Sequence, residues 1–270
     1  MGLRPVASII ADRQIGLAKR KGKWMSELKA YQVWDAGSRW FHWINVLCIM
    51  GLAAVGTTIL YASSFDASDA GKINLKTVHT FIGYVFVLNL LFRFVWAFTG
   101  NRYARWRSFL PGGKGYMHSL RSYVTAFVSG PPENYIGHNP IGRIAVTVLL
   151  ILISIQAVTG LVLAGTDLFF PPFGFWIAEW VAAPGVDPAS LLPYAPEMYD
   201  AAAWDAMRSI RKPILTLHEI SFYILMCGII VHVAGVILTE KKGGGGLISA
   251  MFTGTKIIKG EPVDMEDNQS

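Results

Sequence analysis

Histidines are the residues of this chain that could bind a metal ion. An ionisable group inside a long apolar stretch is costly and usually functional. An imidazole there can ligate a metal or donate a hydrogen bond to a neighbouring helix, and four such imidazoles favour ligation. The four that lie in or beside apolar stretches are His42, His79, His218 and His232.

The spacing of the last two histidines limits what they can bind. His218 and His232 lie fourteen residues apart, which is ~21 Å along a helix at about 1.5 Å per residue. Fourteen steps of about 100° leave the two side chains only about 40° apart around the helix axis. They share one face but cannot reach the same metal ion, so each needs a partner from another helix.

The elements that carry these histidines are predicted to be membrane-spanning helices. Only 16% of the residues are charged and 53% are hydrophobic, whereas a soluble domain has about 25% charged residues. A helix needs about 20 apolar residues to cross the hydrocarbon core. We therefore expect an all-α membrane protein, a four-helix bundle whose spans cover residues 41–62, 77–98, 144–164 and 214–238.

The distribution of lysine and arginine predicts the orientation of the bundle. Eighteen of these residues precede the first span, lie between the second and third, or follow the fourth, against five in the other two connections. Positive residues stay on the cytoplasmic side, so both termini are expected there. Their position beside the spans also excludes nucleic acid as the reason for the pI of 9.3.

This topology divides the chain into three parts. The expected parts are a basic cytoplasmic extension (1–33), a four-helix membrane domain (34–240) with an outer loop (165–213), and a cytoplasmic tail (241–270).

Depth in the membrane predicts how the histidines pair. His79 and His218 lie near the outer ends of their spans, and His42 and His232 lie nearer the inner ends. Ligand sites in bundles form between side chains on facing helices. Two imidazoles can fill both axial positions of a haem iron, which then changes oxidation state without binding oxygen. We therefore expect two haems b, the outer held by His79 and His218 and the inner by His42 and His232.

Small and basic residues near the histidines would complete these sites. A porphyrin is broad and flat and needs small neighbours, and Gly83 lies four residues after His79 on the same helix face. Haem propionates need cations near the membrane surface, and Arg39, Arg93 and Arg143 are inner candidates. His118 and His138 are expected to be loop residues that do not ligate. Further glycines available for close packing are Gly51, Gly56, Gly160, Gly228 and Gly235.

Several motifs resemble the bacterial di-haem cytochrome b superfamily, above all the b-type cytochrome of nickel–iron hydrogenases. The resemblance covers roughly residues 33–259. Besides the four histidines it is carried by Arg39-Trp40-Phe41-His42-Trp43, His79-Thr80-Phe81-Ile82-Gly83-Tyr84, Arg93-Phe94-Val95-Trp96-Ala97-Phe98, Gly137-His138-Asn139-Pro140 and Ile248-Ser249-Ala250-Met251-Phe252-Thr253-Gly254.

The resemblance implies that the four histidines are haem ligands and that electrons from a periplasmic partner pass to quinone. The chain would then be the electron-transfer subunit of an oxidoreductase complex in the bacterial inner membrane. Two cysteines, Cys48 and Cys227, cannot form a four-cysteine nickel site, so a partner such as the hydrogenase subunits would carry that chemistry.

Two alternatives remain open from the residues alone. A stand-alone quinone-linked membrane oxidoreductase could act on a small molecule at the outer face, with the long third connection as a lid. A membrane transporter could use the histidines for copper or zinc, although the two pairs are expected to be far apart, without a carboxylate or cysteine beside them.

Overall fold

Four long helices dominate the fold, a computed structural model that describes residues 28–243 and 245–268. Each is long and apolar enough to cross a membrane, so the prediction of a four-helix membrane bundle is confirmed. They are α2 (Ala36–Leu60), α3 (Asp69–Thr99), α6 (Pro140–Leu168) and α8 (Ala201–Lys241).

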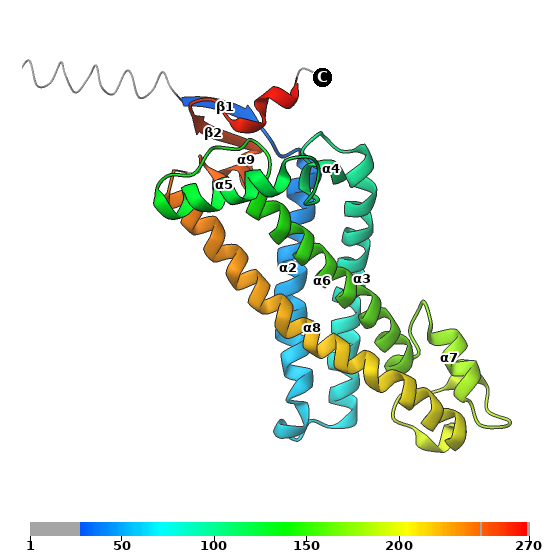
Figure 1. Cartoon of the computed structure of the whole chain (residues 1–270). Coiled ribbons are helices and arrows are strands. Elements are labelled where there is room, and N and C mark those ends of the chain that lie inside the picture. The colour runs from blue at the N-terminus through cyan, green and yellow to red at the C-terminus, as the bar shows by residue number, and fades with distance from the viewer. Residues whose placement is uncertain (1–27, 244, 269–270) are drawn as a thin grey trace, which may run out of the picture.

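Shorter elements lie at the two ends of this bundle. They are α4 (Trp106–Phe109), α5 (Tyr116–Ser129), α7 (Gly174–Val181), α9 (Leu247–Thr253), the strands β1 (Leu28–Gln32) and β2 (Thr255–Lys259), and 3-10 helices at Ala62–Phe65, Pro188–Ser190, Pro196–Met198 and Val263–Asn268. We call the end that carries β1 and β2 the sheet end, and the opposite end, which carries α7, the α7 end (Figure 1).

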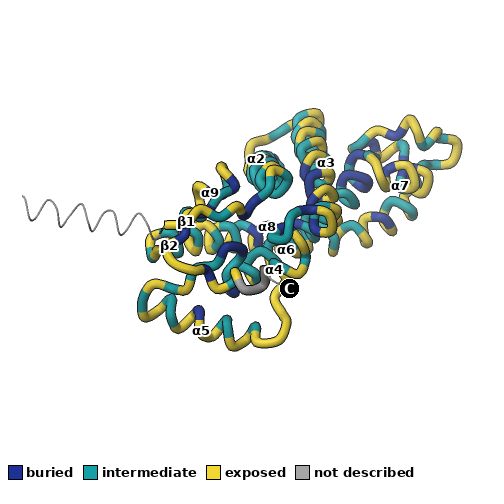
Figure 2. The backbone as a smooth tube through the Cα atoms, turned by 90° about the horizontal axis from the view of Figure 1, so that it is seen from above, coloured by how far each residue is buried: buried dark blue, intermediate teal, exposed yellow. Residues whose placement is uncertain are grey.

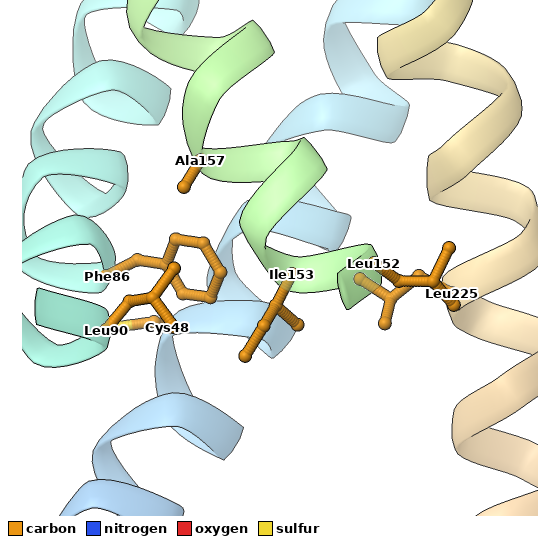
Figure 3. Packing of buried hydrophobic residues seen from close by; sticks show 7 residues of the cluster. All are labelled: Cys48, Phe86, Leu90, Leu152, Ile153, Ala157 and Leu225. Carbon is orange, nitrogen blue, oxygen red and sulfur yellow. The ribbon is translucent and has the colours of Figure 1, made fainter. Parts of the chain in front are cut away.

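The helices pack in chain order, α2 against α3, α3 against α6, and α6 against α8. In Figure 1, α6 and α8 are inclined to the nearly parallel pair α2 and α3. All four contribute to one apolar core, shown in Figure 3: Cys48, Phe86, Leu90, Leu152, Ile153, Ala157 and Leu225.

A network around Asp35 aligns the start of α2 with the end of α3. The Asp35 carboxylate caps α2 by accepting a hydrogen bond from the Ser38 amide at 2.8 Å. It also accepts one from Trp96 Nε1 at 3.1 Å and one from the Asn101 amide at 3.0 Å. Burial alone would raise the pKa of Asp35, but these hydrogen bonds outweigh burial and hold the pKa below its ordinary value. His42, six residues into α2, is thereby held at a fixed depth relative to α3.

The two ends of the described chain meet at the sheet end. Strands β1 and β2 pair antiparallel, from Leu28 opposite Lys259 to Gln32 opposite Thr255. The fold therefore contains a two-stranded sheet besides the expected helices. The C-terminal tail and the N-terminal extension were predicted as separate parts, but the tail pairs with the last residues of the extension. The rest of that extension, residues 1–27, lies outside the described residues.

The third connection contains more helix than its sequence indicates. Helix α8 begins at Ala201, although its apolar part was expected to begin near residue 214. Asp200 caps the helix by accepting a hydrogen bond from the Ala203 amide at 2.8 Å. The view down the bundle in Figure 2 places α7 to one side of the four long helices. This position argues against a helix that covers the mouth of the bundle.

Candidate functional site

His79 on α3 and His218 on α8 lie close together in the half of the bundle nearer the α7 end. Their ring centroids are 6.4 Å apart and the ring planes are inclined by 72°. Metal ions such as zinc bind imidazole nitrogen at about 2.0–2.1 Å, so two imidazoles on one metal ion have centroids about 6 Å apart. The observed separation leaves room for a metal ion between the rings.

A threonine on α6 fixes the tautomer of His218. Thr159 Oγ1 lies 2.7 Å from His218 Nδ1 and donates its own proton to the carbonyl of Ile155 at 2.7 Å. Because a hydroxyl has one proton, donation to this carbonyl makes His218 Nδ1 the donor in the shared hydrogen bond, and we assign this tautomer. The Nε2 lone pair is then available for a metal. Outer partners of this kind orient metal-binding histidines.

Gln156 of α6 holds the backbone of α8 in place beside His218. Gln156 Nε2 donates to the His218 carbonyl at 2.8 Å and to Ser221 Oγ at 2.9 Å. Neither Thr159 nor Gln156 was identified from the sequence, because a single polar residue in an apolar span forms no recognisable motif.

Glycines surround the same pair of rings. A Cβ at Gly56 would lie 3.1 Å from His79 Cε1, and one at Gly160 would lie 3.5 Å from His218 Cε1. A Cβ at Gly83 would have no atom within 4 Å. The chain thus approaches the rings closely on two sides and is open beside Gly83, which suits a flat ligand edge.

His42 on α2 and His232 on α8 lie in the half nearer the sheet end. The two side chains interact electrostatically. His42 Nδ1 is buried without a hydrogen-bond partner among the described residues, and the ring stands edge-on to Trp43 with centroids 5.1 Å apart. The structure brings the rings of His79 and His218 together and places His42 within electrostatic range of His232; the assignment of each pair to one haem stays a prediction.

Arg39, predicted to bind the cofactor, contacts the tail of the chain. Its Nη1 donates a hydrogen bond to the Phe252 carbonyl at 2.7 Å. One turn further along α2, Trp43 Nε1 donates to the Met251 carbonyl at 3.0 Å. Both side chains therefore hold α9 against the start of α2.

Of the two remaining histidines, His118 makes no hydrogen bond or ring contact with either pair in the described part of the chain, and His138 lies within electrostatic range of His232. His118 lies in α5, a helix within the connection read as a loop. His138 lies in the segment before α6 as expected, with its ring centroid 4.8 Å from that of Trp34. Burial and the nearby positive charge of Lys256 lower the pKa of His138 to about 3.

An ion-pair cluster that the sequence did not reveal joins three helices at the α7 end. Asp167 on α6 accepts from Lys76 Nζ of α3 at 2.6 Å, and from Arg211 Nε and Nη2 of α8 at 2.5 and 2.9 Å. The cluster fixes α3 and α8, the two helices that carry His79 and His218, against α6.

The donor set suits haem better than a bare transition metal. Structural zinc sites use four ligands and catalytic sites three from the protein. Among the described residues, no group of three or more His, Cys, Asp or Glu side chains comes together to hold a metal. A pair of histidines suits a metal whose other ligands come with it, as iron does in a porphyrin.

Comparisons with known proteins support this assignment. Residues 33–254 match the family described as prokaryotic cytochrome b561. Two proteins named probable Ni/Fe-hydrogenase B-type cytochrome subunit are 25% identical (Cupriavidus necator) and 26% identical (Azotobacter vinelandii) to this chain. These alignments cover 86% and 87% of this chain and 89% and 92% of the relatives.

A shorter alignment reaches higher identity. The probable Ni/Fe-hydrogenase 1 B-type cytochrome subunit of Escherichia coli K12 is 32% identical over 54% of this chain and 66% of its own length. No solved structure gives a significant match. Because the family match extends over most of the chain, the protein belongs to the prokaryotic cytochrome b561 family and is an integral membrane electron-transfer protein that binds haem b.

Proposed function

We propose that this protein is a di-haem cytochrome b subunit that transfers electrons between a periplasmic redox partner and quinone in the bacterial inner membrane. The observation that supports this proposal most is the pair His79 and His218, with ring centroids 6.4 Å apart and with the Nε2 lone pair of His218 free. A second pair at another depth extends the path for electrons through the bundle.

The chain's own residues hold the cofactors at two depths. His79 and His218 bind the iron of one haem, and His42 and His232 bind the iron of the other. Haem iron held by two imidazoles supplies one-electron transfer without binding oxygen. The fourteen residues between His218 and His232 correspond to ~21 Å along α8, so the two sites together cover most of a hydrocarbon core of about 30 Å.

Charge supports the direction in which the bundle faces. The connections at the sheet end and the two terminal segments carry eighteen of the lysines and arginines. Positive residues stay inside, so the sheet end faces the cytoplasm and the α7 end faces the periplasm. His79 and His218 are then the outer pair.

The names of the relatives support a hydrogenase as the partner. The relatives from Cupriavidus necator and Azotobacter vinelandii are both named as hydrogenase cytochrome subunits. With two cysteines, this chain cannot hold a four-cysteine nickel site itself. The partner is therefore a hydrogenase whose electrons enter at the outer haem, and quinone accepts them from the inner haem.

Native membranes test this function. Membranes that contain the protein are incubated with hydrogen, and haem b reduction is followed by absorbance while the partner is identified by mild detergent co-purification. We expect hydrogen to reduce the haem and added quinone to reoxidise it, with hydrogenase subunits co-purifying. Haem that responds to quinol but not to hydrogen, in a chain that purifies alone, would support the stand-alone oxidoreductase instead.

A further inference from the structure

Buried polar atoms without a partner concentrate at the sheet end of the bundle. Nearly all buried polar side-chain atoms in folded proteins have a hydrogen-bond partner, so such a concentration indicates that a polar group completes the site. Among the described residues, the buried atoms at this end without a partner are Ser38 Oγ, His42 Nδ1, Asn45 Oδ1, Arg93 Nη1, Trp106 Nε1, His138 Nδ1 and Arg143 Nε.

Three of these residues form one stripe of α2. Ser38, His42 and Asn45 are spaced by four and three residues, which places them on the same face of a helix. The stripe includes a proposed haem ligand, so its two polar neighbours lie one turn to either side of that ligand.

Arg93 is a buried cation on α3, next to α2, that makes no ion pair within the described part of the chain. Its side chain is 8% exposed, and its guanidinium carbon lies 4.6 Å from the Phe109 ring centroid and 5.8 Å from that of Phe41. The ion pairs of Lys72, Lys76 and Arg211 do not include Arg93, and the Asp35 carboxylate acts on it without forming a salt bridge. A buried charge without a directly paired counter-ion is costly.

The depth of Arg93 relates it to the inner histidine pair. Asn89 Nδ2 donates to the Phe41 carbonyl at 3.0 Å, which places Asn89 level with the residue before His42. Arg93 lies one turn further along α3, about 6 Å nearer the sheet end at 1.5 Å per residue. The cation is therefore nearer the sheet end than His42, between the rings of Phe41 and Phe109.

We propose that Arg93 binds a carboxylate of the haem held by His42 and His232, with the Ser38 hydroxyl as a second donor. The inference rests on the proposed function, since it needs that haem. Haem b carries two carboxylates on one edge, and an arginine fork binds a carboxylate in bidentate geometry. Arg39 is the weaker candidate for this role, because its Nη1 already donates to the Phe252 carbonyl.

The test compares two forms of the cofactor in two forms of the protein. The apoprotein is reconstituted with haem b or with its dimethyl ester, which lacks free carboxylates, and occupancy of each site is measured from the spectrum. Wild type should bind the ester about 10–100-fold more weakly than haem at the inner site, as expected for the loss of a charge-assisted pair. In Arg93→Gln this discrimination should disappear.

A matched control and a second readout separate this inference from the proposed function. Arg102→Gln removes a cation at the same end, whose guanidinium carbon lies 5.3 Å from the Tyr103 ring centroid, and should discriminate as wild type does. Arg93→Gln should also lower the midpoint potential of the inner haem alone, because a lost positive charge disfavours the reduced form. If wild type binds two haems but takes haem and ester equally well at the inner site, the inference is wrong. If wild type binds no haem, the proposed function itself is wrong.

Discussion

Replacing Thr159 with valine would remove one hydroxyl beside His218 while keeping the shape of the side chain. His218 Nδ1 now donates to Thr159 Oγ1 at 2.7 Å, and in Thr159→Val this buried N–H has no partner. An unsatisfied buried donor costs about 1–3 kcal/mol. Loss of an outer partner of a metal-bound histidine lowers metal affinity by about 10–100-fold, or about 1.4–2.7 kcal/mol. The unpaired N–H destabilises the fold with or without haem, so the range for metal affinity sets the expectation: haem at the outer site should bind about ten-fold or more weakly.

The assay is competition for haem with an excess of a haem-scavenging protein, followed spectroscopically for each site. Thr159→Ser keeps the hydroxyl and should retain most of the affinity. Thr147→Val serves as the matched control on the same helix, because Thr147 Oγ1 donates to the Phe109 carbonyl instead. If Thr159→Val and Thr147→Val release haem at the same rate as wild type, the hydrogen bond does not orient His218 for ligation, and the tautomer argument fails.

Three other changes test different parts of the structure. Asp167→Asn leaves the two cations that pair with Asp167 without their anion. The free energy of unfolding, followed by thermal unfolding in detergent, should therefore fall by about 3 kcal/mol, and an unchanged midpoint temperature would show that the cluster does not join the helices. Gly56→Ala places a Cβ 3.1 Å from His79 Cε1, so the outer haem should be lost in preference to the inner one, and equal loss of both would contradict the close approach. Burial lowers the pKa of Lys256 to about 8. Above that pH the unfolded chain binds more protons than the folded one, so the free energy of unfolding should rise between about pH 8 and 10. Lys256→Met should remove this rise, and a variant with the same pH profile as wild type would show that Lys256 is not responsible.

The sequence predicted those features that depend on local pattern. Four apolar windows give four spanning helices, and residue counts along them place His42, His79, His218 and His232 at two depths. Residue counts predict these depths because the rise per residue is the same in every α-helix, whatever the helix packs against.

Features that depend on partners distant in sequence were not predicted. The charged residues Arg208 and Arg211 end the apolar window of the fourth span, yet α8 continues past them to begin at Ala201. Arg211 is compensated by Asp167, 44 residues earlier in the chain, and no local pattern links the two. The same holds for β1 and β2, five-residue strands at opposite ends of the described chain.

Residues that complete the candidate site were partly visible in the sequence. The need for small residues beside a porphyrin identified Gly56 and Gly160 among several glycines, and only the structure places these two against the rings of His79 and His218. Arg93 was one of three candidate cations, and burial distinguishes it from Arg39, which contacts the tail.

The most direct test of the account is the haem content of four single variants in which His42, His79, His218 or His232 is replaced by leucine. Wild type should contain two low-spin haems b per chain in a pyridine haemochrome assay. The variants at His79 and His218 should lose one and the same haem, and those at His42 and His232 should lose the other. Wild type without haem, or a shared loss by the His42 and His79 variants, would contradict the pairing of ligands across the bundle.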